Sequence, residues 1–232
     1  MTTDEGLETT PDIGFAKEGQ LDPSTTVLMV IDMTYGNAHS DYGLCEMCRQ
    51  NGLDISYYVD RLEQLVIPAI KKVTEAARDA GIKVIYFQNG AELEDYSDVH
   101  KNLRPVYQLW QQRRGKPGFE IREEIRPEEG DLVLTKIASG AWAGTNIDNI
   151  LRFRRVEHVI ATGVATNGCV LTTALGGWDK GFFFTIVEDA TATTGQRVHE
   201  QAIEVMRDYG MPICSSDEIV RTIAESVTPK NA

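Results

Sequence analysis

The sequence predicts an α/β protein: a doubly wound, six-stranded, mostly parallel sheet with helices on both faces. Six short apolar runs alternate with longer segments whose apolar residues recur at helical spacing. The runs are rich in β-branched residues and end at polar or glycine-containing turns, as strands buried on both faces do. This alternation is typical of an open parallel sheet that is covered by helices.

Length and composition predict one large folded unit. With 232 residues and 42% apolar content, the chain can bury a sizeable core, and no linker-like break divides it. Residues 1–20 are polar and acidic, so we expect them to form a flexible N-terminal arm. We expect residues 21–228 to form a single domain.

Charge and cysteine content narrow the partners and the compartment. The net charge of −12 argues against nucleic acid and against an anionic membrane surface. No apolar run approaches the roughly 18 residues of a membrane span, and the N-terminus does not resemble a signal peptide. Four scattered cysteines are typical of a reducing compartment. We therefore expect a cytoplasmic protein.

The first strand is expected over residues 25–31, a continuous β-rich run that ends at Asp32. Residues 33–56 have no sustained period, which predicts a long binding loop. Helical spacing returns over 57–80, where Pro68 is expected to bend the helix and Gly81 to end it.

The rest of the chain continues the alternation. Further strands are expected over 82–87, 131–135, 156–161, 182–187 and 212–214, and helices over about 99–113, 146–153, 170–180, 193–209 and 217–226. In such sheets the ligand crevice lies at the carboxyl ends of the strands. That rule brings Asp32, Lys136 and the turn before Cys169 to the same edge.

Cys169 follows a strand and opens a helix, in the sequence Ala-Thr-Gly-Val-Ala-Thr-Asn-Gly-Cys-Val-Leu (161–171). Free backbone N–H groups and the helix dipole at such a position are expected to lower the pKa of the thiol and to make it a nucleophile. The alternative is a small buried cysteine that packs as a hydrophobic residue. The turn-forming Gly, Thr and Asn around it favour the nucleophile.

Three residue types with complementary chemistry are thus expected at one edge. Asp32 can take the thiol proton, Lys136 can stabilise the carboxylate and the thiolate, and the backbone N–H groups of Ala165 and Cys169 can hold an oxyanion. Attack on an amide would give a thioester and release ammonia or an amine. The alternative is a structural Asp–Lys ion pair that bridges two strands.

These motifs resemble the isochorismatase-like cysteine hydrolases. The resemblance is carried by Val-Ile-Asp-Met (30–33), Lys136 after the third strand and Gly-Val-Ala-Thr-Asn-Gly-Cys-Val (163–170), and it spans about residues 21–223. It implies a doubly wound α/β fold, a catalytic triad of Asp32, Lys136 and Cys169, and a non-proline cis peptide between Val164 and Ala165. It also implies a homodimer or homotetramer.

The resemblance also bears on the substrate. A cysteine nucleophile points to C–N bonds rather than to the vinyl ether of isochorismatase itself. Nicotinamidases of this family carry an Asp-x-His and a further His as a metal site, and the four histidines here show no such grouping, so we expect no metal and no cofactor. Tyr-Phe-Gln-Asn-Gly (86–90), with His100-Lys101 after it, is similar to ureidoacrylate amidohydrolases. A small amide, carbamoyl or ureido compound is the expected substrate.

Five residues are expected to contact that substrate. Gln88 and Asn89 offer amide donors and acceptors for a urea-like group, or they merely close a strand. Tyr35 and Trp142 offer flat rings for stacking, or they belong to the core. Val164 lies next to the expected oxyanion site.

Other functions remain open at this point. A nicotinamidase-like or isochorismatase-type hydrolase acting on another small substrate is one, and a non-catalytic binding protein of the same fold is another. A third is a redox protein that uses the Cys-x-x-Cys pair Cys45 and Cys48.

Overall fold

The computed structural model describes residues 21–228, and the predicted arm 1–20 lies outside the described residues. Six strands form one sheet in the order β3-β2-β1-β4-β5-β6, and every pairing is parallel. The strands are β1 Thr26–Ile31, β2 Lys83–Asn89, β3 Leu132–Lys136, β4 His158–Val164, β5 Phe183–Ala192 and β6 Ile213–Cys214. The predicted doubly wound α/β fold is confirmed, with a sheet that is wholly parallel.

β1 lies at the centre of the sheet, between β2 and β4. All six of its residues are buried. Because successive side chains of a strand point to opposite faces, Leu28 and Val30 enter one hydrophobic cluster, whereas Val27 and Met29 enter the other. This explains the continuous apolar run in the sequence.

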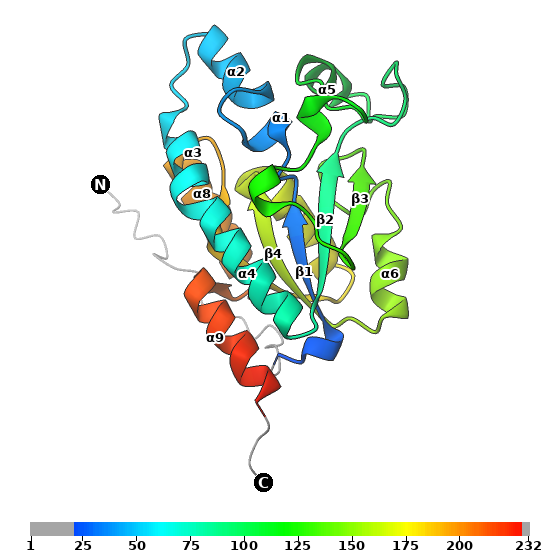
Figure 1. Ribbon diagram of the computed structural model, residues 1–232, viewed down its shortest axis with the longest axis vertical. Helices are drawn as coiled ribbons and strands as arrows, with labels where there is room; N and C mark the ends of the chain where they lie inside the picture. Colours follow the sequence, from blue (N-terminus) through cyan, green and yellow to red (C-terminus); the bar gives the residue numbers. More distant parts are fainter. Residues whose placement is uncertain (1–20, 229–232) are drawn as a thin grey trace, which may run out of the picture.

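Helices cover both faces, as predicted (Figure 1). One face carries α3 Ser56–Arg61, α4 Ile67–Asp79 and α9 Ser216–Val227, with α4 and α9 side by side. The other face carries α6 Ile147–Phe153, α7 Leu171–Trp178 and α8 Gln196–Asp208. Short turns of 3-10 helix lie at Pro23–Thr25, Pro117–Phe119 and Glu123–Ile125.

The predicted loop over 33–56 was wrong in part, because it holds two short helices. α1 Tyr35–Ala38 and α2 Gly43–Gln50 lie beyond the carboxyl ends of the strands (Figure 1). α2 buries Cys45 and Cys48. α1 has four residues and α2 has eight, which is too few to give a clear helical period in the sequence.

Two further predictions need correction. The predicted helix 99–113 is much shorter, α5 Arg104–Leu109, because Gln111 has a φ of +53° and cannot continue a right-handed helix. The predicted helix 57–80 is continuous but contains a π turn, Leu62–Val66, directly before α4. Pro68 has no backbone N–H to donate to the preceding turn, which accounts for the irregularity.

β5 runs five residues beyond its predicted end at 187 and includes Glu188 and Asp189. The register between β4 and β5 shifts between Ala161 and Gly163, which allows the longer strand to stay paired.

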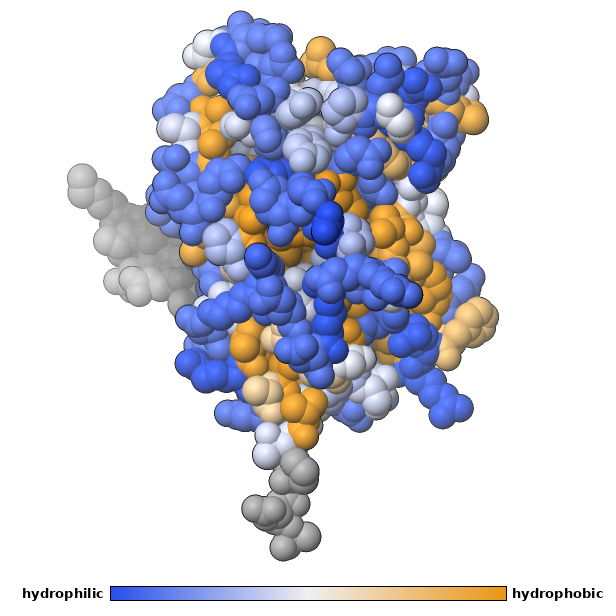
Figure 2. Space-filling view, viewed as in Figure 1, coloured by the Kyte–Doolittle hydropathy of each residue, from blue (hydrophilic) through white to orange (hydrophobic). Residues whose placement is uncertain are grey.

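The face in Figure 2 is largely hydrophilic, with hydrophobic residues showing between the elements. Within residues 21–228, every helix is too short or too polar to cross a membrane.

Candidate active site

Asp32 lies directly after β1, where the strand order reverses between β1 and β4. Its backbone has a φ of +52°, a left-handed conformation that Asp tolerates better than most residues. Its N–H donates to the Phe87 carbonyl at 3.0 Å, and its carbonyl accepts a hydrogen bond from Asn37 Nδ2 at 3.2 Å. These contacts fix the backbone from which the carboxylate projects.

Lys136, the last residue of β3, reaches Asp32 across the end of β2. Its Nζ lies 2.7 Å from Asp32 Oδ2, and the two side chains are 0% and 1% exposed. Nζ also donates to the carbonyls of Ala138 at 2.8 Å and Ser139 at 2.7 Å. Three acceptors therefore match the three protons of the ammonium group.

Cys169 lies in a π turn, Thr166–Val170, between β4 and α7. The turn is closed by the Ala165 carbonyl, which accepts hydrogen bonds from the N–H groups of Gly168 at 2.9 Å and Val170 at 3.2 Å. The peptide bond between Val164 and Ala165 is cis, as the family resemblance implied. The turn presents a partly exposed Cys169 beside the buried ion pair.

The sulfur has polar neighbours on two sides. Ser139 Oγ donates to Cys169 Sγ at 3.7 Å, and the Asp32 carboxylate lies close enough to the sulfur to raise the pKa of the thiol. Since the Ser139 carbonyl also accepts from Lys136, this loop residue contacts both the cation and the sulfur. The structure therefore brings Asp32, Lys136 and Cys169 together.

The predicted lowering of the thiol pKa was wrong. Burial, together with the negative charge of Asp32, raises the pKa of Cys169 to about 11, although Lys136 acts in the opposite direction. The expectation from the helix terminus omitted both effects, which come from tertiary structure. The free protein thus holds a neutral thiol next to a carboxylate, which favours proton transfer during attack over a preformed thiolate.

The charges of the ion pair depend on one another. Burial raises the pKa of Asp32 above its ordinary value, while the Lys136 ammonium opposes this. Burial also disfavours the ammonium, but the negative charge of Asp32 outweighs it, and the pKa of Lys136 is raised. Lys136 is therefore the fixed positive charge of the site, and Asp32 is the group able to exchange a proton.

Gln88 and Asn89 are both buried and hydrogen-bonded within the protein. Gln88 Nε2 donates to the Phe119 carbonyl at 2.9 Å. Asn89 Oδ1 accepts from Asn37 Nδ2 at 2.6 Å and from Gln112 Nε2 at 3.0 Å. Asn89 is also the register partner of Lys136, which places it next to the triad. A substrate contact for either amide remains a prediction.

The two predicted aromatic contacts lie in different surroundings. Trp142 donates from Nε1 to the Thr173 carbonyl at 2.7 Å and stacks on Phe182 with 5.6 Å between ring centroids. These contacts are those of a ring packed against α7 and the start of β5. Val164 is buried at the end of β4. For both residues a role in substrate binding remains a prediction.

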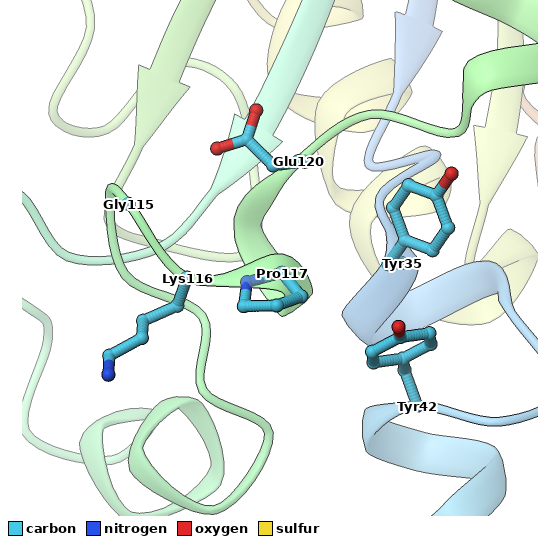
Figure 3. A pocket seen from close by; sticks show the side chains of 6 residues that line it. All are labelled: Tyr35, Tyr42, Gly115, Lys116, Pro117 and Glu120. Carbon is cyan, nitrogen blue, oxygen red and sulfur yellow. The ribbon is translucent and has the colours of Figure 1, made fainter.

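Tyr35 lines a pocket of about 440 Å³ on the side of α1 and α2. Its ring meets Tyr42 edge to face, with centroids 5.4 Å apart, and the segment Gly115–Pro117 forms the opposite wall (Figure 3). Lys116 and Glu120 add one charge of each sign. Tyr35 thus contributes to a hollow beyond the carboxyl ends of the strands.

Sequence reasoning missed several residues of the site. Tyr107 of α5 is buried and close enough for Lys136, Asp32 and Cys169 to influence its pKa, which burial raises. Ser139 lies in the small-residue stretch 137–144 that follows the third strand. Only the small-residue stretch after the third strand could have pointed to Ser139, and no pattern in the sequence singles out Tyr107.

No three His, Cys, Asp or Glu side chains within residues 21–228 are grouped so that they could hold a metal ion. The Cys-x-x-Cys pair lies on one buried side of α2, and both cysteines are free. Burial raises the pKa of Cys45 to about 11.

Comparison with known proteins identifies the family of this chain. A family model described as the isochorismatase domain matches residues 26–218. The chain belongs to the isochorismatase family. It is 34% identical over 197 residues to the ureidoacrylate amidohydrolase RutB of Caulobacter segnis, covering 78% of each chain. It is 32% identical over 194 residues to RutB of Serratia proteamaculans, covering 78% of this chain and 75% of the relative.

Two solved structures share the fold. N-carbamoylsarcosine amidase from Thermoplasma acidophilum superposes with a TM-score of 0.64 and 26% identity, covering 83% of this chain and 97% of the other. A cysteine hydrolase from Pseudomonas syringae pv. phaseolicola superposes with a TM-score of 0.71 and 24% identity, covering 90% and 97%. The predicted family is confirmed.

Proposed function

We propose that this protein is a cysteine-dependent amidohydrolase that cleaves a C–N bond of a small carbamoyl or ureido compound. The observation that carries the proposal is the buried Lys136–Asp32 pair, 2.7 Å apart, in contact with a partly exposed cysteine. A purely structural ion pair would not need a partly exposed cysteine next to its carboxylate. The names of the relatives, ureidoacrylate amidohydrolase and N-carbamoylsarcosine amidase, support this substrate class.

The first step is attack by sulfur. As the Cys169 Sγ–carbon bond forms, the thiol proton passes to Asp32, and the carbonyl oxygen becomes an oxyanion. The backbone N–H groups of Ala165 and Cys169 hold that oxyanion, and each such donor contributes about 3 kcal/mol to transition-state stabilisation. Lys136 stabilises the site electrostatically throughout, because it stays positive.

The second step is loss of the nitrogen. The tetrahedral intermediate collapses, the C–N bond breaks, and Asp32 returns its proton to the departing nitrogen, which leaves as ammonia or an amine. Cys169 then carries the acyl group as a thioester. Asp32 next takes a proton from water as the water attacks the thioester, and the thiol is restored when the acid product leaves. One carboxyl group, that of Asp32, thus accepts and donates the proton in every transfer.

Three finer features belong to the same proposal. The substrate lies against Tyr35, Gln88, Asn89, Trp142 and Val164. Residues 21–228 act as one hydrolase domain, and the family resemblance supports a homodimer or homotetramer. The four free cysteines support a cytoplasmic location.

Ammonia release tests the function directly. The protein should release ammonia from a panel containing 3-ureidoacrylate, N-carbamoylsarcosine, biuret and nicotinamide, with turnover confined to the carbamoyl and ureido compounds. Cys169→Ala should remove that turnover while the circular dichroism spectrum stays unchanged. Cys214→Ala is the matched control and should keep full activity. Ammonia release by folded Cys169→Ala would refute the mechanism.

A further inference from the structure

Next to the turn that carries Cys169, four side chains from four different elements form a relay. Thr166 Oγ1 lies 2.9 Å from His199 Nδ1, and His199 Nε2 lies 2.7 Å from Glu188 Oε1. Arg61 Nη2 lies 2.7 Å from the same Glu188 oxygen. Thr166 and His199 are buried, whereas Glu188 reaches the surface. The relay thus ties α3, β5 and α8 to the first residue of the turn.

The distances fix the proton positions in the relay. A ring nitrogen 2.7 Å from a carboxylate oxygen must carry a proton, because two lone pairs would repel at that distance. Nε2 of His199 therefore donates to Glu188. In the neutral ring Nδ1 is then the acceptor, and the Thr166 hydroxyl donates to it. Thr166 is fully buried, so its hydroxyl cannot attack a substrate.

Arg61 completes the relay at its outer end. Besides the Glu188 carboxylate, the guanidinium donates to the carbonyls of Glu188 and Thr191, each at 2.9 Å. Arg61 Nη2 also lies 3.0 Å from His199 Nε2, so the two groups share the Glu188 oxygen. Glu188 is held by two partners, and it in turn fixes the orientation of the imidazole ring.

The turn has a second anchor on the same side. Thr193 Oγ1, just beyond β5, donates to Asn167 Oδ1 at 2.7 Å. Thr166 and Asn167 precede Cys169 by three and two residues, and both are thus held by side chains from the β5–α8 region. The Ala165 carbonyl that closes the turn comes directly before these anchors. Movement of Thr166 would shift the sulfur and the proposed oxyanion N–H groups together.

We propose that His199 is a positioning residue for the nucleophile: through Thr166 it holds the turn so that Cys169 stays aligned with Asp32. This inference rests on the proposed function of Cys169. Because no relay atom touches the reacting groups in the structure, losing the His199–Thr166 bond should lower kcat and leave KM nearly unchanged. Misplacement of a reacting group by about 1 Å costs on the order of 100-fold in rate.

Two substitutions at position 199 test the contacts of the two ring nitrogens separately. In His199→Gln the amide reaches the place of Nε2, so the Glu188 contact is kept and the Thr166 contact is lost. In His199→Asn the amide occupies the place of Nδ1, so the Thr166 contact is kept. With 3-ureidoacrylate as substrate, we expect kcat to fall about 10- to 100-fold in His199→Gln and to stay within a few-fold of wild type in His199→Asn. Thr166→Val should match the first variant and Thr166→Ser the second.

A second His–Thr pair provides the control for simple destabilisation. His158 Nε2 lies 3.0 Å from Thr185 Oγ1, also buried, near the amino ends of β4 and β5 and away from Cys169. Thr185→Val should lower Tm and leave kcat unchanged. The proposal is overturned if folded His199→Gln and Thr166→Val keep wild-type kcat, or if kcat follows Tm equally in Thr185→Val.

Alkylation keeps this test separate from the test of the proposed function. The pH midpoint for reaction of Cys169 with iodoacetamide reports the alignment of the sulfur with Asp32 even without turnover. We expect the midpoint to move towards that of an ordinary thiol in His199→Gln and to stay in His199→Asn. Turnover by Cys169→Ala would refute the hydrolase mechanism, whereas an unmoved midpoint with unchanged kcat would refute only the role of His199.

Discussion

Lys136 Nζ lies 2.7 Å from Asp32 Oδ2, and neither side chain reaches solvent. The two residues are 104 positions apart in the sequence, on strands separated by β2. A buried ion pair is weak evidence for stability, because desolvation offsets much of the attraction between the charges. The position of Cys169 beside it supports a functional reason for the pair.

Removing one partner of this pair should cost far more than removing both charges. Lys136→Met leaves a buried carboxylate without its cation, and we expect the free energy of unfolding to fall by about 3–5 kcal/mol. Asp32→Asn suits the left-handed backbone and leaves a buried ammonium. The double variant should be less destabilised than the sum of the singles, as urea unfolding would measure.

An ion pair on the surface serves as the control for this comparison of single and double variants. Lys72 and Asp217 also form an ion pair, but both are well exposed. Lys72→Met should therefore change Tm little. Strictly additive changes in unfolding free energy at positions 32 and 136 would contradict the coupling between the two charges. All variants at these two positions should also lose ammonia release.

The reactivity of Cys169 should be low at neutral pH and should rise steeply in alkali. Because burial and Asp32 raise the pKa of the thiol to about 11, alkylation by iodoacetamide should increase about tenfold per pH unit from pH 7 to 10. Asp32→Asn removes the negative charge, so the pKa should fall and alkylation at pH 8 should become faster. Mass mapping of the Cys169 peptide gives the rate, and a plateau below pH 8 in the wild type would contradict this charge state.

The sequence was sufficient for the fold and for bringing Asp32, Lys136 and Cys169 to one edge of the sheet. Asp32 and Cys169 follow apolar strands and Lys136 ends one, and the rule for parallel sheets brings strand ends together without any side-chain information. The pKa of Cys169 could not be inferred in this way, because the direction of its shift depends on burial and on the distance to Asp32.

The other features that the sequence did not predict also depend on tertiary contacts. α1 and α2 are stabilised by packing rather than by long periodic faces, as the hydrogen bond from Tyr58 Oη to the Asn37 carbonyl illustrates. Likewise, His199 showed no metal-ligand grouping in the sequence, and only the folded chain places it against Thr166. Short helices and side-chain networks between distant segments leave no local period to detect.

Because of Glu188, the free energy of unfolding should depend on pH under acidic conditions. Its hydrogen bond with His199, together with Arg61, lowers its pKa to about 2 from an ordinary value near 4.5. A carboxylate with a lowered pKa in the fold stabilises the protein above pH 4.5, and this contribution is lost as the pH falls towards 2. The difference in unfolding free energy between wild type and Glu188→Gln should therefore shrink from pH 6 to pH 2.5. A difference that stays constant over this range would contradict the lowered pKa.

Gly163 should be the least replaceable glycine near the site. It has a φ of +105°, and a Cβ there would lie 2.1 Å from the Ile31 carbonyl oxygen of the neighbouring strand. Gly181 also has a positive φ, +86°, but nothing lies within 4 Å of a Cβ at that position. We expect Gly181→Ala to cost only the left-handed conformation, about 1–2 kcal/mol.

Gly163→Ala must in addition push β1 and β4 apart, directly next to Asp32 and the cysteine turn. Urea unfolding should show a clearly larger loss of stability than in Gly181→Ala, and kcat should fall only in Gly163→Ala. Because both variants lose the same conformational freedom of glycine, the difference between them measures the steric contact with Ile31. Equal losses in the two variants would mean that the strands at this point accommodate a methyl group and that the sheet does not hold the site rigidly.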